Sequence, residues 1–342
     1  MKKEGLLQSE GFKSVAASVL SILIGLAVGS IVIIIVGLTS PNLSLSAAWD
    51  GIRIVFGGLF STGRDSEMCI RDRYKTGLFN IGAPGQYLIG TLVSLSIALG
   101  LPSETMSTTL IWILAFVGGT LAGALWGVIP GMFKAFLNIN EVLACIMTNW
   151  IAANLVTWLF DISNFKNVAE STKTGYIYKT TYNGVATAKM GLDKLFPGSQ
   201  VNGGIIIAVV FAIGVYVMMS KTTFGYQLKA CGSNRHAARY AGIADKRNIV
   251  ISMAIAGGLS AAGASLYYLS GNTEFFWSTY QSLPAIGFNG IPVAMLASCN
   301  PIGIIFTALF MSMLDISGLQ LTNLTAYNEY ITNVIIAVIV YL

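Results

Sequence analysis

The sequence predicts an all-α polytopic membrane protein, and two observations support this fold class. Only 10% of the 342 residues are charged, while 54% are hydrophobic and the mean hydropathy is +0.70. Soluble domains carry about a quarter charged residues, so this chain must turn much of its apolar surface towards lipid. The apolar residues also form runs of about 20, the length at which a helix crosses a bilayer core. The alternative, a soluble protein with one very large core, fits neither observation.

Candidate membrane segments recur along the whole chain. The first, residues 15–38, is an uncharged run that is longer than the apolar core of a signal peptide. Further membrane segments are expected at residues 81–101, 109–133, 141–160, 202–220, 249–270, 283–318 and 330–342. The last segment is short and has no polar cap, so we expect the C-terminus to be truncated. Together the segments predict a single transmembrane domain over residues 1–342.

The distribution of basic residues predicts how the segments are oriented. Residues 221–248 contain six Lys or Arg residues against one acidic residue, Asp245. Short loops that are rich in Lys and Arg stay in the cytoplasm. The basic residues Lys2, Lys3 and Lys13 place the N-terminus on the same side, so the expected orientation has a cytoplasmic N-terminus.

This orientation requires one more span than the apolar runs supply. Five spans between an inside N-terminus and residue 221 would leave the basic loop outside, and the deficit falls between residues 38 and 78. Either residues 47–60 cross as a short helix, or a genuine span has been replaced. Residues 61–77 hold seven charges, and each central charge costs about 2.5–3.5 kcal/mol in lipid. We therefore expect that residues 61–74 are not a membrane helix. The loop 161–200 is expected outside, because the single span 202–220 separates it from the cytoplasmic loop 221–248.

Four glycines recur at every fourth position of one expected span. Gly119, Gly123, Gly127 and Gly131 would form one stripe on a helix, where a neighbouring backbone can approach closely. Close helix packing is the first interpretation of this stripe. A substrate path lined by the stripe is the second.

The stretch GLFNIGAPGQ at residues 77–86 predicts an interrupted helix. Gly82, Pro84 and Gly85 lie too close together for a continuous helix, and Asn80 and Gln86 could hydrogen-bond the freed backbone groups or a polar solute. A break at membrane depth is tolerated only beside protein or a wet cavity. A loop at the membrane edge is the alternative. A second interrupted region at residues 285–292 resembles the first, as in transporters with paired broken helices.

Signatures of catalysis and of metal binding are missing from the sequence. It contains no phosphate-binding loop, zinc-protease motif or nucleophile elbow. The single histidine, His236, lies in the basic loop, and the four cysteines show no metal or disulfide spacing. Among charged residues at span positions, Glu141 is expected to favour a helix N-terminus, with a relay role as the alternative. Asp315 is either a functional carboxylate or a residue at the water boundary. We therefore expect no enzyme activity, no cofactor and no metal site.

The motifs resemble the ABC importer permeases for nucleosides and simple sugars that work with basic membrane lipoproteins. The GLFNIG stretch looks like the signature of this family, and residues 140–142, 225–243 and 287–301 are similar to it in the same order. The resemblance covers residues 75–342. It implies a type II-like ABC importer permease with broken helices, which has about ten spans in an intact relative.

The resemblance also implies roles for individual residues. Residues that match the substrate path are Phe79, Asn80, Gly85, Gln86 and Asn289. Residues that match the segment coupling the permease to its ATPase (the coupling segment, residues 225–243) are Gly232, Asn234, Arg235, Ala237, Ala238, Arg239, Tyr240 and Gly242. Pro84 stands where the family usually has an acidic residue, which puts the role of that position in doubt.

A second departure concerns the segment before the signature. Family members have an apolar membrane helix there, whereas this chain has the charged residues 61–75. We expect residues 65–73 to be foreign sequence, such as a translated assembly junction or sequencing adapter. In that case the chain is a damaged copy that cannot transport.

The function expected from the resemblance is ATP-driven import of a nucleoside or a related sugar-like solute across the bacterial plasma membrane. The implied partners are an ABC ATPase subunit, a second permease subunit, an extracellular substrate-binding lipoprotein and the lipid bilayer, with no nucleic acid. The alternative is an ion-coupled secondary transporter of a small polar solute. Such a carrier needs several buried carboxylates or histidines, and the sequence offers little beyond Asp315. A membrane-embedded enzyme and a structural scaffold are further alternatives.

Overall fold

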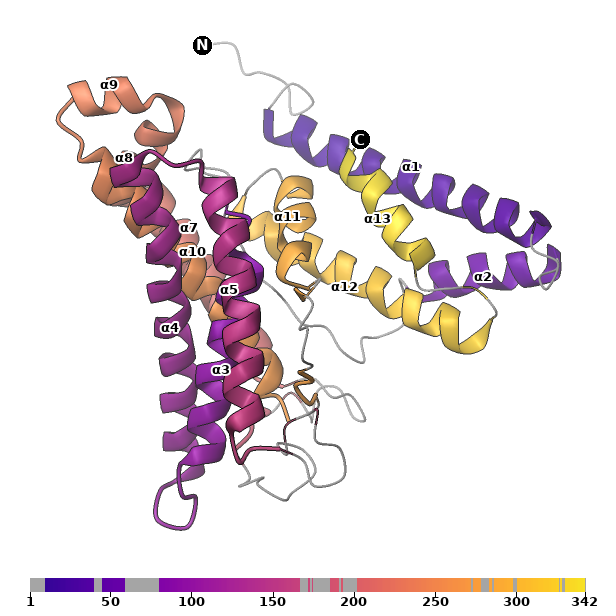
Figure 1. The fold of residues 1–342 in the computed structure, drawn as a ribbon. Coiled ribbons are helices and arrows are strands. Elements are labelled where there is room, and N and C mark those ends of the chain that lie inside the picture. Colours follow the sequence, from indigo (N-terminus) through magenta and orange to yellow (C-terminus); the bar gives the residue numbers. More distant parts are fainter. Residues whose placement is uncertain are drawn as a thin grey trace. The chain divides into compact units, whose positions relative to one another are not determined.

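The computed structural model consists of α-helices joined by loops over the part of the chain that it describes (Figure 1). It describes residues 10–39, 45–58, 80–166, 172, 174, 185–190, 192, 202–271, 273–277, 283–284, 286–297, 300–325, 327 and 330–341. The chain divides into two compact units. The first unit comprises Met1–Glu67 and Pro292–Leu342, and the second comprises Met68–Ile291.

The second unit is a bundle of long apolar helices with a short helical pair at one end (Figure 1). Its helices are α3 (Ala83–Gly100), α4 (Thr108–Leu137), α5 (Glu141–Ile162), α7 (Gly204–Lys221), α8 (Thr223–Ser233), α9 (Arg235–Tyr240), α10 (Asp245–Tyr268) and the start of α11 (Ile286–Leu296). Helices α3, α4 and α10 pack against one another, and α5 contacts α3 and α4. The predicted spans 81–101, 109–133, 141–160, 202–220 and 249–270 correspond to α3, α4, α5, α7 and α10.

The glycine stripe of α4 provides the close packing that holds this bundle together. A Cβ built on Gly127 would be 2.5 Å from the Met253 carbonyl oxygen of α10, and one on Gly119 would be 2.9 Å from the Gly90 carbonyl oxygen of α3. A side chain at these positions would therefore collide with the backbone of a neighbouring helix. The packing interpretation of the stripe is confirmed by these contacts.

Both ends of α5 are fixed by polar contacts. At its start the Asn140 side chain accepts a hydrogen bond from the Val142 N–H at 2.9 Å. Glu141 forms an ion pair of 2.7 Å with Lys134 at the end of α4, so the predicted place of Glu141 at a helix N-terminus is confirmed.

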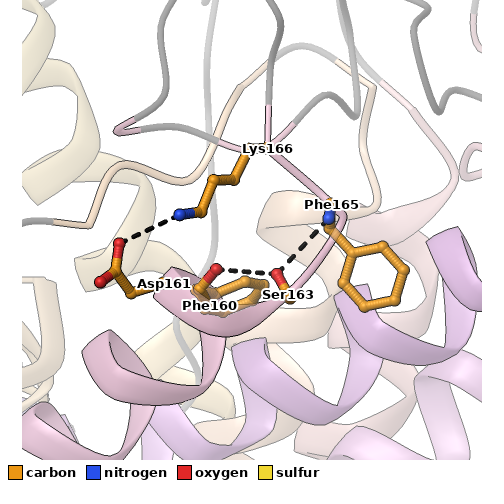
Figure 2. A network of polar contacts seen from close by, with 5 residues as sticks. All are labelled: Phe160, Asp161, Ser163, Phe165 and Lys166. Carbon is orange, nitrogen blue, oxygen red and sulfur yellow. Dashed lines mark hydrogen bonds and ion pairs between the residues drawn. The ribbon is translucent and has the colours of Figure 1, made fainter.

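At the other end of α5, the Ser163 hydroxyl donates to the Phe160 carbonyl at 2.8 Å and accepts from the Phe165 N–H at 3.4 Å (Figure 2). Lys166 approaches Asp161 at 3.1 Å in the same turn. The hydroxyl satisfies backbone groups that the helix end leaves without partners. The chain can therefore leave α5 abruptly after Ile162.

Over the described residues, the first unit contains four complete helices and the end of α11. The complete helices are α1 (Glu10–Thr39), α2 (Leu45–Gly58), α12 (Pro301–Leu324) and α13 (Tyr330–Tyr341). Gly25 and Gly29 of α1 face the side chains of Ile339 and Ile335 of α13. The Tyr327 hydroxyl donates to the Ile33 carbonyl at 3.1 Å, which joins the segment before α13 to α1.

The region expected to hold the missing span contains a short helix. Helix α2 has 14 residues, which corresponds to about 21 Å and is shorter than a bilayer core of roughly 30 Å. Its buried residues Ala48, Gly51 and Val55 lie on one face, while Asp50 and Arg53 are exposed. The predicted short helix at residues 47–60 is thus present, but it is too short to cross the core upright. The charged residues 61–74 lie outside the described residues.

The described residues include seven helices that are long and apolar enough to cross a membrane. They are α1, α3, α4, α5, α7, α10 and α12, while α11 is a shorter apolar helix. The apolar region expected at residues 283–318 is thus divided into α11 and α12. Asp315, a candidate functional carboxylate, is exposed on α12. The fold class predicted from composition and apolar runs is confirmed.

Candidate functional site at the break before α3 and in the coupling segment

The break that the sequence predicts before α3 lies midway along the bundle of the second unit. A Cβ built on Gly123 would be 3.2 Å from the Gln86 carbonyl oxygen, and one on Gly127 would be 3.3 Å from Gln86 Nε2. Both glycines are near the midpoint of α4, which has 30 residues. The helix break, here defined as residues 80–86, comprises the turn before α3 and the first residues of that helix, and it lies beside the middle of α4. Residues 59–79 lie outside the described residues, so a helix that precedes the break stays a prediction.

Side chains from two other helices satisfy backbone groups of the helix break. The Gly85 N–H donates to Asn149 Oδ1 of α5 at 3.0 Å, and Asn149 Nδ2 donates to the Ile81 carbonyl at 2.9 Å. The Ser260 hydroxyl of α10 donates to the Ala83 carbonyl at 2.9 Å. Buried backbone groups without partners cost about 1–3 kcal/mol each, so these side chains allow the break to exist inside the bundle.

A pair of carboxamides closes the helix break from within. Asn80 Nδ2 donates to Gln86 Oε1 at 2.9 Å, and Gln86 Nε2 donates back to Asn80 Oδ1 at 3.4 Å. The same Asn80 oxygen accepts from the Gly82 N–H at 2.9 Å and lies 3.7 Å from the Cys145 sulfur of α5. Asn80 is 2% exposed and Gln86 is 0% exposed. The cluster is uncharged, buried and supplied with both donors and acceptors.

The structure brings together three of the five predicted path residues. Asn80, Gly85 and Gln86 share one buried cluster, whereas Asn289 is exposed on α11. Phe79 lies outside the described residues. The interruption predicted at residues 285–292 is wrong for residues 286–292, which lie in the continuous helix α11 with Pro292 inside it. This helix meets the cluster, because a Cβ on Gly287 would be 2.6 Å from the Pro84 Cα.

Sequence reasoning missed two residues that complete the cluster, Asn149 and Ser260. Asn149 is 1% exposed and Ser260 is 3% exposed. The sequence offered one signal for Asn149, which is a carboxamide eight residues after the start of an apolar span. No spacing rule connects Asn149 to the helix break, which lies 64 residues earlier in the chain.

The coupling segment forms two short helices at one end of the bundle (Figure 1). The Thr222 side chain accepts from the Gly225 N–H at 3.1 Å at the start of α8. The Asn234 side chain accepts from the Ala237 N–H at 3.0 Å at the start of α9. Gly242 follows α9 with a φ of +80°, a conformation that glycine adopts without strain. The segment thus contains the short helix α9, with α8 before it.

The predicted coupling residues have different environments. Arg235 is half-buried and forms an ion pair of 2.7 Å with Asp245. Ala238 is 4% exposed, so its side chain packs inside the segment. Tyr240 is 97% exposed. The other predicted coupling residues on the surface are Asn234, Ala237, Arg239 and Gly242, while Gly232 is half-buried. The surface that this segment offers to a partner is therefore formed by α9 without Ala238.

Comparisons with known proteins connect this architecture to one family. The family model described as "Branched-chain amino acid transport system / permease component" matches residues 73–342. The guanosine ABC transporter permease protein NupP of Bacillus subtilis is 29% identical over 330 residues, which cover 94% of this chain and 90% of that protein. The nucleoside ABC transporter permease protein NupB of Lactococcus lactis is 36% identical over 73% of this chain and 67% of its own length.

A third relative carries a different solute in its name. The glucose ABC transporter permease protein of Haloferax volcanii is 28% identical over 71% of this chain and 63% of its own length. No solved structure matches the chain significantly. The match to the family model and the apolar helices together show that the chain belongs to the permease family of branched-chain amino acid transport systems, and that it is a multi-pass membrane permease subunit of an ABC importer, not itself an enzyme.

Proposed function

We propose that the importer to which this chain belongs carries nucleosides or related sugar-like solutes. The observation that carries the proposal is the similarity to the guanosine permease of B. subtilis, which extends over 94% of this chain. The similarity to a nucleoside permease of L. lactis supports the same class. The glucose permease of H. volcanii keeps simple sugars within the proposed range.

The chemistry of the helix break is compatible with such solutes. Asn80, Gln86 and Asn149 are carboxamides, which offer donors and acceptors without charge. Nucleosides and sugars likewise present hydroxyl, carbonyl and amine groups without net charge. We assign the border of the solute path to Phe79, Asn80, Gly85, Gln86 and Asn289. Three of these residues, Asn80, Gly85 and Gln86, are buried. Solute can therefore reach them only after the bundle opens.

We further propose how the chain is placed among its partners. The two units form one transmembrane domain in the bacterial plasma membrane, with a cytoplasmic N-terminus and the loop 161–200 outside. An ABC ATPase subunit docks on the exposed surface of α9, around Ala237, Arg239 and Tyr240. A second permease subunit completes the path, and an extracellular lipoprotein delivers the solute. Closure of the paired ATPases on ATP then moves the coupling segment and rocks the helices between outward and inward openings.

An uptake experiment tests the proposed solute class. The full chain, in a copy with an intact apolar helix in place of the charged residues 61–75, is expressed with the ATPase, second permease and lipoprotein of its genomic neighbourhood. The host cells lack nucleoside uptake of their own. Radiolabelled guanosine should accumulate above the level of cells without the chain, and unlabelled nucleosides should compete better than glucose. Stronger competition by glucose would assign a sugar instead. Absence of uptake for both solutes would refute the proposed class.

The same system tests the energy source. Uptake into right-side-out vesicles should require ATP loaded inside, on the cytoplasmic side, and should survive dissipation of ion gradients by ionophores. Uptake that follows an ion gradient in the absence of ATP would favour an ion-coupled carrier.

A further inference from the structure

We propose that Asn149 of α5 is a positioning residue that holds the helix break closed, and that its two hydrogen bonds to the break open during transport. These two hydrogen bonds, from the Gly85 N–H and to the Ile81 carbonyl, are here called the Asn149 bridge. The proposal deepens the transport function proposed above and rests on it. It assigns to the chain a residue that controls access to Asn80 and Gln86.

The geometry shows why this position needs a short carboxamide. Asn149 uses both ends of its amide, one as acceptor at 3.0 Å and the other as donor at 2.9 Å. A Cβ built on Gly85 would be 2.7 Å from Asn149 Oδ1 and 2.9 Å from Asn149 Cα. The backbones of α3 and α5 are thus in contact at this point. Only a side chain that bends back along its own helix and carries a donor beside an acceptor can make the Asn149 bridge.

Helices α10 and α5 both approach the backbone of α3 closely, and they differ in how many side-chain hydrogen bonds join them to the break, one from Ser260 and two at Asn149. A Cβ on Gly90 would be 2.7 Å from the Ala261 Cα, so α3 and α10 interlock through their backbones. Such packing has no substitute when the helices separate. Hydrogen bonds of the Asn149 bridge can be exchanged for hydrogen bonds to water or solute, at little net cost. In this proposal the bundle opens at the seam between α3 and α5, where the Asn149 bridge supplies two such exchangeable hydrogen bonds.

The seam is not polar along its whole length, which determines where it opens. Beyond Asn149, the second half of α5 is buried in an apolar cluster with α3 through Ala152, Val156 and Phe160. The Asn149 bridge lies between this cluster and the start of α5 at Glu141. We infer that the apolar cluster stays packed as a pivot. The half of the seam that contains the bridge separates.

Opening of the bridge would expose groups suited to a neutral solute. The freed set contains the Gly85 N–H, the Ile81 carbonyl and the carboxamides of Asn149, Asn80 and Gln86. A carboxamide can donate one hydrogen bond and accept another from the same edge of a solute, if that edge carries a donor beside an acceptor. Nucleobases have such edges. They can also bind adjacent hydroxyls of a sugar. The chemistry that this set recognises is an uncharged edge with both donors and acceptors.

Cys145 provides a native reporter of the opening. It is 0% exposed, and its sulfur lies 3.7 Å from Asn80 Oδ1 beside the bridge. A buried thiol reacts with a maleimide only when the structure opens locally, so its alkylation rate reports the population of the open form. The background for the experiment is the full chain with Cys69, Cys231 and Cys299 replaced by Ala, in membranes that contain its partner subunits. N-ethylmaleimide is the probe.

Asn149→Leu should raise the alkylation rate of Cys145 by about five- to a hundredfold, because it removes two hydrogen bonds that hold the closed form. Asn154→Leu is the matched control. Asn154 lies on the same helix, is exposed, and donates to the Trp150 carbonyl of its own helix at 2.8 Å. Its replacement should change the rate less than about twofold, which is the range expected for surface positions.

Val156→Ala separates local opening from general loosening. Val156 is 0% exposed in the apolar cluster and its side chain forms no hydrogen bond. This variant should lower the thermal midpoint of the chain without raising the Cys145 rate comparably. If Asn149→Leu does not reach the membrane, Asn149→Ser serves in its place. The serine hydroxyl is too short to span both partners.

The link to transport is tested by measuring the Cys145 alkylation rate with and without ATP. In the parent chain, ATP turnover should raise the Cys145 rate several-fold over the nucleotide-free state, and in Asn149→Leu this difference should largely disappear. An unchanged rate in Asn149→Leu, or a rise equal to that of Val156→Ala at matched loss of stability, overturns the proposal. Alkylation does not depend on which solute is carried. Failure of guanosine uptake with the predicted labelling would therefore refute the solute class and leave the Asn149 bridge standing.

Discussion

The substitution Gly127→Ala tests whether backbone contact between α4 and α10 organises the second unit. The new Cβ would be 2.5 Å from the Met253 carbonyl oxygen and 3.2 Å from its carbonyl carbon. Carbon and oxygen in favourable contact lie about 3.3–3.6 Å apart. The colliding atoms belong to the backbone, so rotation of a side chain cannot relieve them. Helices α4 and α10 must separate locally by several tenths of an ångström or more.

The expected cost follows from two opposing terms. Overpacking a close-packed interior costs about 1–3 kcal/mol, while Gly→Ala in a helix gains about 0.5–1 kcal/mol. The net loss is about 1–2 kcal/mol. At about 2–4 °C per kcal/mol for a domain of this size, the thermal midpoint should fall by about 2–8 °C. The measurement is thermal unfolding of the purified chain in detergent, followed by tryptophan fluorescence.

Two glycines provide matched controls for Gly127→Ala. A Cβ on Gly214 of α7 would meet nothing within 4 Å, and one on Gly258 of α10 would meet its nearest atom, the Ala124 Cβ, at 3.4 Å. Gly214→Ala and Gly258→Ala should leave the midpoint unchanged or raise it slightly, through helix propensity alone. A fall in these controls equal to that in Gly127→Ala would refute the argument from backbone contact.

Three further predictions concern the coupling segment, the topology and the charged stretch. Ala237→Trp should block pull-down of the ATPase while the segment stays folded, whereas Ala238→Trp should unfold the segment because Ala238 is buried. If Ala237→Trp pulls down as much ATPase as the parent chain does, α9 is not the docking surface. Impermeant thiol labelling of intact cells should reach a cysteine placed at Lys179 and spare one at Lys229, and the reverse pattern would contradict the proposed orientation. Independent resequencing of the locus should change residues 65–73, and an unchanged reading would end the proposal that they are foreign.

Much of the fold could be predicted from the sequence because lipid imposes a simple rule. A helix that crosses a bilayer must be apolar over about 20 residues, so the runs at 109–133 and 141–160 revealed α4 and α5 within a few residues of their bounds. The glycine stripe revealed its packing role for the same reason, since spacing along a helix determines which face its residues share. Gly82, Pro84 and Gly85 lie where α3 begins, and proline is favoured in the first turn of a helix.

The partners of the helix break were decided only by the tertiary structure. Asn149 and Ser260 lie 64 and 177 residues from the groups that they bind, and no local pattern encodes such pairings. The burial of Ala238 beside the exposed Tyr240 was hidden for the same reason, because both lie in one polar stretch whose turns are set by α8 and α10. Local chemistry thus determined that this chain crosses a membrane and where its helices run and break. The long-range packing of α3, α4, α5 and α10 decided which side chains satisfy the break, since burial removes water as a partner and each freed backbone group must then find one within the protein.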